Sequence, residues 1–161
     1  MDWQKLFNKQ KELDAYISNQ HALQGQNLLE EKILALLVEL GELANETRCF
    51  KFWSTKERAE RKVILEEYVD NIHFLLSIGL EKGYHFSKID FDTVDTQETL
   101  QFNRVFQQCL HFYEDQSKEN YLQLFKAYLQ LGSILGFDER DILEAYEKKN
   151  EVNYERQEQG Y

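Results

Sequence analysis

Proline is absent from the 161 residues of the chain, and glycine occurs only seven times. Proline breaks helix interiors and both residues mark turns, so their scarcity leaves room for long uninterrupted helices. The two cysteines, Cys49 and Cys109, are too few for a disulfide framework, which favours a reducing cytoplasm. No apolar run follows the polar first residues. We therefore expect neither a signal peptide nor a membrane-spanning segment.

Positive charge is also scarce, because 19 Lys and Arg stand against 29 Asp and Glu and give a net charge of −10. Nucleic acids and anionic membranes are bound through clusters of cations, so we expect neither as a partner. A phosphate compound would have to be bound locally, by metal ions or a small basic patch. Hydrophobic residues make up 42% of the chain, which is enough for the core of a single domain over residues 1–161.

Apolar residues recur at helical spacings along nearly the whole chain, and no β-type alternation of useful length interrupts them. This pattern predicts an all-α fold, a bundle of about five to seven helices. Ser117 and Asp138 are predicted to start helices, whereas Gly83 and Gly136 are predicted to end them. The first predicted helix carries Trp3 to Ile17, and the others cover residues 27–46, 55–82, 96–114, 118–135 and 138–150, with a connector over 87–95.

Two pairs of acidic residues lie on consecutive predicted helices. Glu39 and Glu42 are three residues apart, as are Glu67 and Asp70. This spacing places the members of each pair on one helix face, where like charges repel. A cation between them would reverse the sign of that interaction, and hard divalent ions such as Mg²⁺ prefer carboxylate oxygens. The pairs therefore suggest a metal site.

The competing interpretation is a solvated surface, which is the usual role of acidic pairs on helices. The second pair argues against it. Its helix carries Val63 and Phe74 on the acidic face and an apolar row on the opposite face. A helix that is apolar on two faces is central and largely buried, and buried charge without compensation is too costly. Two antiparallel helices would then bring both pairs around one cation cluster.

Glu-x-x-Glu followed on the next helix by Glu-x-x-Asp resembles the signature of the MazG-related all-α nucleotide pyrophosphatases, and its surroundings resemble the dimeric dUTPases. Residues 39–54 (ELGELANETRCFKFWS) look like their first metal helix and aromatic–lysine loop, and residues 66–77 (EEYVDNIHFLLS) look like their second metal helix. Residues 146–157 (YEKKNEVNYERQ), with Gly160 and Tyr161, resemble their phosphate-binding C-terminal motif. Residues 10–14 (QKELD) are similar to the helix that helps to read uracil.

The resemblance implies a homodimer that hydrolyses dUTP to dUMP and pyrophosphate, with dUDP also accepted, using Mg²⁺ or Mn²⁺. It assigns Glu39, Glu42, Glu67 and Asp70 as metal ligands. A carboxylate beside the metal is suited to take the proton of the attacking water, and Glu39 is the first candidate for this catalytic base. The resemblance also points to attack at the β-phosphorus.

Several residues carry an alternative beside their predicted role in substrate binding. Gln10 and Asp14 interrupt the apolar stripe of the first helix, either as a helix boundary or as groups that read the base. The loop aromatics Phe50, Phe52 and Trp53 form either core or, together with Lys51, a stacking platform next to a phosphate contact. Phe74 either serves as helix core alone or also packs against the deoxyribose.

The last dozen residues are polar and lack an apolar stripe, which is typical of a frayed tail. If they are helical, Lys149, Asn150, Asn153 and Arg156 form one stripe that would bind phosphates, and residues 149–161 become a phosphate-binding segment. Two other functions stay open at this point. One is a MazG-like pyrophosphatase for dCTP or a broad dNTP set, and the other is a non-catalytic metal-binding helical dimer.

Overall fold

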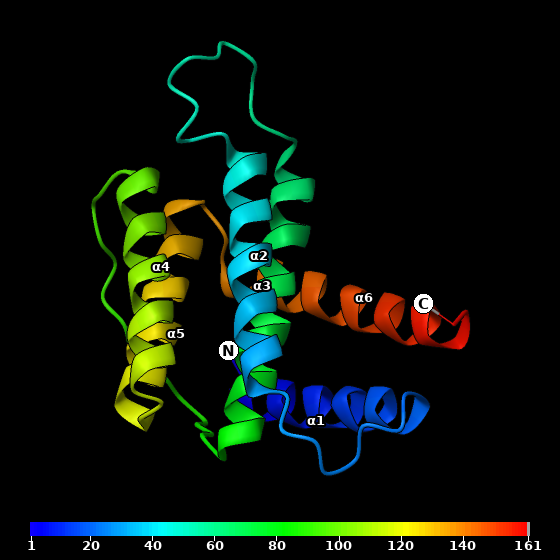
Figure 1. Cartoon of the computed structure of the whole chain (residues 1–161). Helices are drawn as coiled ribbons and strands as arrows, with labels where there is room; N and C mark the ends of the chain where they lie inside the picture. The colour runs from blue at the N-terminus through cyan, green and yellow to red at the C-terminus, as the bar shows by residue number, and fades with distance from the viewer. Residues whose placement is uncertain (161) are drawn as a thin grey trace.

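The computed structural model describes residues 1–160. Over these residues the protein is all-helical, with six helices and no strand, which confirms the predicted fold class (Figure 1). Tyr161, the end of the predicted segment 149–161, lies outside the described residues. The helices are α1 (Trp3–Gln20), α2 (Leu29–Thr47), α3 (Arg61–Lys82), α4 (Glu98–Glu114), α5 (Lys118–Ile134) and α6 (Glu139–Glu158).

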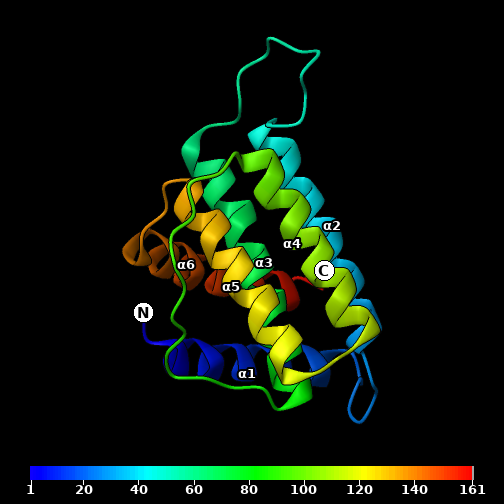
Figure 2. The same ribbon diagram turned by 90° about the vertical axis from the view of Figure 1, so that its left-hand side faces the viewer.

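Helix α3 is the centre of the fold, because it contacts α1, α2, α5 and α6. It packs most extensively against α2, its antiparallel neighbour. The α4–α5 hairpin lies on one side of this pair, and α1 and α6 lie on the other side (Figures 1 and 2). A central α3 is what its two apolar faces predict.

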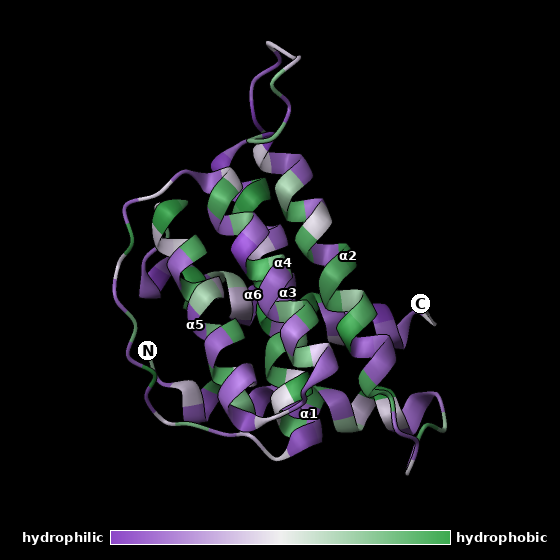
Figure 3. Cartoon of the chain, turned by 60° about the vertical axis from the view of Figure 1, so that its left-hand side comes forward, coloured by the Kyte–Doolittle hydropathy of each residue, from purple (hydrophilic) through white to green (hydrophobic). Residues whose placement is uncertain are grey.

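Hydrophobic and hydrophilic positions alternate along the helices (Figure 3). This amphipathic pattern lets each helix bury one face against its neighbours and keep another in water. Among the helices of the described residues, none is long and apolar enough to cross a lipid bilayer.

Close contacts between tyrosine and glycine fix α5 against α3. The stacked rings of Tyr68 and Tyr128 have centroids 4.6 Å apart. The Tyr128 hydroxyl donates to the Tyr68 carbonyl at 2.7 Å, and the Tyr68 hydroxyl donates to the Tyr128 carbonyl at 3.3 Å. A Cβ atom at Gly132 would lie 2.4 Å from the Tyr68 hydroxyl oxygen, so only glycine leaves room for this pairing.

Most predicted helix boundaries agree with the structure. Ser117 and Asp138 cap α5 and α6 through their side chains, and Gly83 and Gly136 follow the helices that they were predicted to end. Gln10 and Asp14 lie inside α1, so their interpretation as a helix boundary is wrong.

The predicted start of the third helix at Thr55 is wrong, because α3 begins at Arg61. Two sets of contacts, one made by Arg48 and one by Ala59, hold the preceding residues in a loop instead. The Arg48 side chain donates to the Ser54 hydroxyl at 2.7 Å and to the Lys56 carbonyl at 3.1 Å. The backbone N–H of Ala59 donates to the carbonyl of Glu46 at 3.0 Å. Neither contact can be read from local helix propensity.

The predicted end of the last helix at Asn150 is also wrong, because α6 continues to Glu158. Its second half packs alongside α1. The rings of Tyr154 and Tyr16 lie 5.1 Å apart, and the side chains of Gln157 and His21 are hydrogen-bonded at 2.7 Å. The frayed-tail interpretation therefore fails for the described part of this segment. The predicted polar stripe is presented on a regular helix.

Candidate active site

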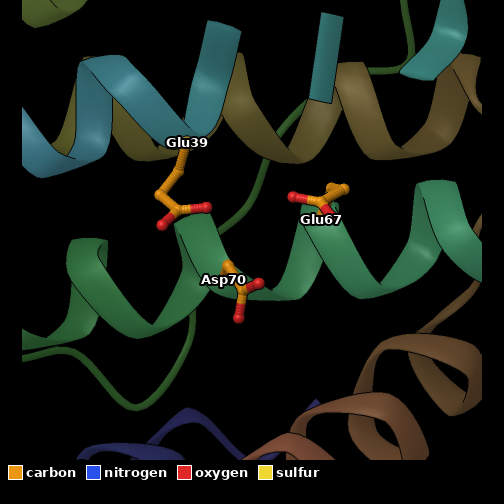
Figure 4. Close-up of side chains that lie close together, drawn as sticks. All are labelled: Glu39, Glu67 and Asp70. Atoms are coloured by element: carbon orange, nitrogen blue, oxygen red, sulfur yellow. The ribbon is translucent and has the colours of Figure 1, made fainter. Parts of the chain in front are cut away.

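Three carboxylates from α2 and α3 meet between these helices. Glu39 extends from α2 toward Glu67 and Asp70 on α3 (Figure 4). One carboxylate oxygen of each residue lies within 4.8 Å of those of the other two, and all three side chains are half-buried. The two acidic pairs thus converge as predicted, although Glu42 is exposed and lies outside this set of three.

Burial and mutual repulsion disfavour the charged forms of this cluster. Burial raises the pKa of Glu39 to about 7, with repulsion from Asp70, Glu42 and Glu67 adding to the shift. The pKa of Glu67 is raised by burial first and then by Asp70 and Glu42. Although Glu42 is not one of the three, its charge therefore acts on them. A divalent cation would remove both penalties, and carboxylate oxygens at this density suit Mg²⁺.

A cation from α6 reaches the same cluster. The Lys149 ammonium lies 2.6 Å from Oδ2 of Asp70, and both side chains are largely buried. Burial raises the pKa of Asp70, whereas Lys149 and, at longer range, Arg156 lower it. The predicted basic stripe and the predicted acidic site therefore adjoin in the fold, across 79 positions of sequence between Asp70 and Lys149.

A cavity of about 640 Å³ opens beside the carboxylates, between α1, α2, α3 and α6. Its volume lies within the range of roughly 300–1,000 Å³ that is usual for small-molecule sites. Glu39 and Asp70 form part of its wall. Six of the predicted substrate-binding residues line it as well: Gln10, Asp14, Phe74, Lys149, Asn153 and Arg156.

Three other predicted residues do not line this cavity. Asn150 is buried in the fold instead, on α6 one turn after Tyr146. Lys51 and Trp53 lie in the loop that joins α2 to α3, at the opposite end of these helices from α1 (Figure 1). Trp53 is 65% exposed and Phe52 is 93% exposed, so the interpretation of these loop aromatics as core is wrong.

A buried polar network forms one wall of the cavity. Gln10 donates from Nε2 to Asp14 at 2.7 Å, and Ser77 donates to the other oxygen of Asp14 at 2.6 Å. The Tyr146 hydroxyl and Nδ1 of His73 both bond to Oε1 of Gln10, at 2.9 and 2.8 Å. The His73 ring also stacks on Tyr146, with centroids 4.1 Å apart.

His73, Ser77 and Tyr146 were not predicted as site residues from the sequence. A signal was present, because positions 70, 73, 74 and 77 share one helix face. Asp70 and Phe74 were selected on that face, and His73 and Ser77 line the same cavity. Tyr146 offered no such signal, because its partner Gln10 is 136 positions away.

The site combines three neighbouring carboxylates, a cavity of the size usual for small molecules and cationic side chains on one helix. A comparison with curated proteins finds no match for the chain. A family model described as dUTPase matches residues 2–161, which is nearly the whole sequence. The chain therefore belongs to the dUTPase family and is a dUTP diphosphatase.

Proposed function

We propose that the enzyme uses Mg²⁺, or Mn²⁺ in its place, to hydrolyse dUTP and dUDP to dUMP, releasing pyrophosphate or phosphate. The observation that carries this proposal is the Glu39–Glu67–Asp70 cluster, two members of which, Glu39 and Asp70, line the cavity. The same cavity presents Lys149 and Arg156, so carboxylates for a metal and cations for phosphates face one space.

The residues present fit a divalent metal. Glu39, Glu67 and Asp70 supply hard oxygen ligands, and Glu42 supplies a fourth carboxylate beside them. A bound Mg²⁺ neutralises phosphate oxygens and lowers the pKa of a water molecule. A cation here also offsets the repulsion among the four carboxylates, which destabilises the folded protein when no metal is bound.

Glu39 is proposed as the base that accepts the proton of the attacking water. Its carboxylate lines the cavity beside Asp70, and a carboxylate held in position can accept a proton from a reacting water. Lys149, Asn153 and Arg156 would hold phosphate oxygens through charge-assisted and amide hydrogen bonds. Asn150 was predicted to belong to this group as well, but it does not line the cavity, so its role in phosphate binding stays a prediction.

The base and sugar are proposed to lie farther along the cavity, near α1. Gln10 and Asp14 line this part of the cavity, and Phe74, one helical turn after Asp70 on α3, lines it as well.

The alternative function is a pyrophosphatase that acts on dCTP or on a broad set of dNTPs. Release of pyrophosphate from a panel of dNTPs tests it. We expect kcat/KM for dUTP to exceed that for dTTP, dCTP and UTP, and equal use of dCTP would refute the uracil assignment.

A homodimer is proposed from the outer apolar side chains of α2 and α4. Leu34 and Val38 on α2 are 63% and 51% exposed, and Leu110 and Tyr113 on α4 are 52% and 51% exposed. The start of α4 meets the end of α2, where the Thr99 hydroxyl donates to the Cys49 carbonyl at 3.0 Å. The helices thus run in opposite directions, and these four residues fall toward the same end. Adjacent exposed apolar groups are typical of an interface.

Lys51 and Trp53 are proposed to reach the nucleotide of the partner subunit. At 1.5 Å per residue, the midpoint between Leu34 and Val38 is about 18 Å from Arg48 and about 12 Å from Leu28. A two-fold axis near that midpoint would place the α2–α3 loop of the partner subunit just beyond Leu28, and Leu28 lines the cavity. Lys51 donates to Asn45 and lies 5.5 Å from the Phe50 ring centroid, so the loop presents it in a defined place.

The proposed compartment is a reducing cytoplasm. Cys49 and Cys109 are free thiols, which suits a reducing cytoplasm. The net charge of −10 disfavours nucleic acid and anionic membrane as partners.

A further inference from the structure

The second half of α6 is a polar helix that carries part of the cavity wall. Asn153 and Arg156 line the cavity there, and their spacing of three places them on one face of the helix. Residues 151–158 are all half-buried or exposed. A helix end without a buried apolar face frays easily, because helical propensity alone does not hold so short a segment. Specific contacts are therefore needed to keep this face toward the cavity.

Helix α3 holds the first half of α6. The ring of Tyr146 stacks on His73, and the ammonium of Lys149 lies 2.6 Å from Oδ2 of Asp70. Helix α6 then continues to Glu158, which at 1.5 Å per residue is about 13 Å beyond Lys149. In Figure 1 this extension leaves the α2–α3 pair and runs beside α1. Support for it has to come from α1.

Two residues of α1 and its C-terminal cap contact the extension. The rings of Tyr16 and Tyr154 meet with centroids 5.1 Å apart. His21, the C-cap of α1, is bonded through Nε2 to Oε1 of Gln157 at 2.7 Å. The amide oxygen only accepts, so the His21 ring is the donor. Both contacts fall within the segment that carries the cavity-lining residues of α6.

These contacts fix the rotation of α6 about its own axis. Tyr154 and Gln157 are three residues apart and form one stripe against α1. Asn153 and Arg156 form the neighbouring stripe, which is offset by one residue, or about 100°. If the first stripe left α1, the second would turn away from the cavity. Helix α1 can act as a support, because its first half is part of the hydrophobic core.

We infer that Tyr16 and His21 are positioning residues for phosphate binding, which hold Asn153 and Arg156 at the cavity from the neighbouring helix. This inference rests on the proposed role of α6 in binding the phosphates. Neither Tyr16 nor His21 lines the cavity, so both act through α6 and not on the nucleotide directly. Their loss should weaken ligands that carry phosphates and spare ligands that do not.

A purely structural role is the competing account. The two contacts would then order the end of α6 without any consequence for the nucleotide. Hydrogen exchange over residues 150–158 would rise when they are removed, but the affinity for a triphosphate would not change. Binding measurements with and without phosphate groups distinguish the two accounts.

The test uses a variant that combines Tyr16→Ala with His21→Ala, and three ligands. The ligands are a dUTP analogue with an imido bridge between its α- and β-phosphates in the presence of Mg²⁺, deoxyuridine, and Mn²⁺ alone. We expect the Kd of the analogue to rise at least about tenfold, or roughly 1.4 kcal/mol. The Kd values of deoxyuridine and Mn²⁺ should stay within about twofold. An unchanged Kd of the analogue, or equal weakening of all three ligands, would overturn the inference.

Conservative variants and a matched control sharpen the test. Tyr16→Phe keeps the ring, and His21→Gln keeps an N–H donor near the place of Nε2, so both should bind the analogue within about threefold of the wild type. Lys5→Met removes a different contact between α1 and α6, the 2.8 Å bond to Glu147 in the first half of α6. It should leave all three Kd values within about twofold. A loss in Lys5→Met equal to that in the double variant would overturn the inference.

Hydrolysis separates this inference from the proposed function. The double variant should lose at least about tenfold in kcat/KM for dUTP, in line with its weaker binding of the analogue. If the wild type hydrolyses dUTP but the Kd of the analogue is the same in the double variant, the inference is wrong and the proposed function stands. If the Kd rises as expected but the wild type hydrolyses no dUTP, the inference stands and the proposed chemistry is wrong.

Discussion

The ammonium of Lys149 lies 2.6 Å from Oδ2 of Asp70, and this ion pair joins the C-terminal helix to the carboxylate cluster. Asp70 is at once a proposed metal ligand and the partner of a proposed phosphate-binding residue. Charge-assisted bonds of this kind are short and strong when they are shielded from water. The pair therefore places the proposed phosphate-binding stripe of α6 next to the proposed metal site.

Replacement of Lys149 by Met should have opposite effects on metal binding and on turnover. The ammonium competes with a divalent cation for Asp70, so the metal-free variant should bind Mn²⁺ more tightly than the wild type. The variant also loses a cation for the phosphates, so kcat/KM for dUTP should fall at least about tenfold, or roughly 1.4 kcal/mol. Titration with Mn²⁺ and steady-state kinetics measure the two effects.

Lys148→Met is the matched control for that variant. Lys148 is the adjacent residue of α6, and its exposed ammonium lies 3.4 Å from Glu66. Exposed ion pairs contribute little, so both Mn²⁺ affinity and kcat/KM should stay within about twofold of the wild type. Equal behaviour of the two variants would show that Lys149 has no special position at the site.

Glu67→Gln should abolish most of the activity while preserving the fold. The substitution keeps the size of the side chain but removes the charge of one proposed ligand, so kcat should fall at least about 10²-fold, or roughly 2.7 kcal/mol. A chelator should likewise stop the wild-type reaction, and Mg²⁺ or Mn²⁺ should restore it. Glu66→Gln changes the neighbouring carboxylate outside the cluster and serves as control. Turnover of Glu67→Gln within threefold of the wild type would contradict the metal assignment.

Glu39→Gln should stabilise the metal-free protein at alkaline pH. Burial and repulsion raise the pKa of Glu39 from 4.5 to about 7, so between these values the folded state binds more protons than the unfolded state. The free energy of unfolding therefore falls as pH rises through this window, and it stays lower above it. Glutamine cannot ionise and avoids this loss.

Thermal unfolding with a chelator present measures this effect. At about pH 8 the Tm of Glu39→Gln should exceed that of the wild type by roughly 2–4 °C, which corresponds to about 1 kcal/mol in a domain of this size. At about pH 5 the two should coincide. Mg²⁺ should raise the Tm of the wild type more than that of the variant. A lower Tm of the variant at both pH values would show that the carboxylate of Glu39 is not strained in the metal-free protein.

The carboxylate cluster and the central position of α3 could be predicted from sequence, because both follow from local helical periodicity. Glu67 and Asp70 share a face by their spacing alone, and the two apolar rows of α3 require burial on both sides. The pairing of Lys149 with Asp70 had no such signal. Residues that far apart in sequence meet only when the packing of α6 on α3 is known.

The end of α6 shows why a polar segment can be mistaken for a tail. Residues 150–158 have no apolar stripe, yet they remain helical because specific contacts with α1 replace a hydrophobic face. Asn150 is even buried there. The loop of residues 48–60 is the opposite case, since Arg48 and the backbone of Ala59 hold polar residues out of a helix that their propensity allows.

The proposed dimer predicts that a charge on the outer face of α2 will produce monomers. Leu34 and Val38 are exposed in the single chain, so replacing both by Glu should leave its core intact. Light scattering should report a monomer for this double variant and a dimer for the wild type. Replacement of Leu100, an exposed leucine near the other end of α4, by Glu serves as control. A wild-type monomer at micromolar concentration with full activity would refute the dimer.

Complementation between two inactive variants should reveal whether Lys51 acts on its own chain or on its partner. In a dimer of Glu67→Gln with Lys51→Ala, one cavity has the altered carboxylate. If the loop acts across the interface, the same cavity also receives the altered lysine, so the other cavity is entirely wild type. Random mixing then restores about a quarter of wild-type activity, because half of the dimers are mixed and each has one intact site. If Lys51 serves its own chain, both cavities stay defective and the mixture remains as inactive as the separate variants.

Refolding the two variants together and assaying dUTP hydrolysis distinguishes these outcomes. The control adds the double replacement of Leu34 and Val38 by Glu to the Lys51→Ala variant, because a chain that stays monomeric cannot complement.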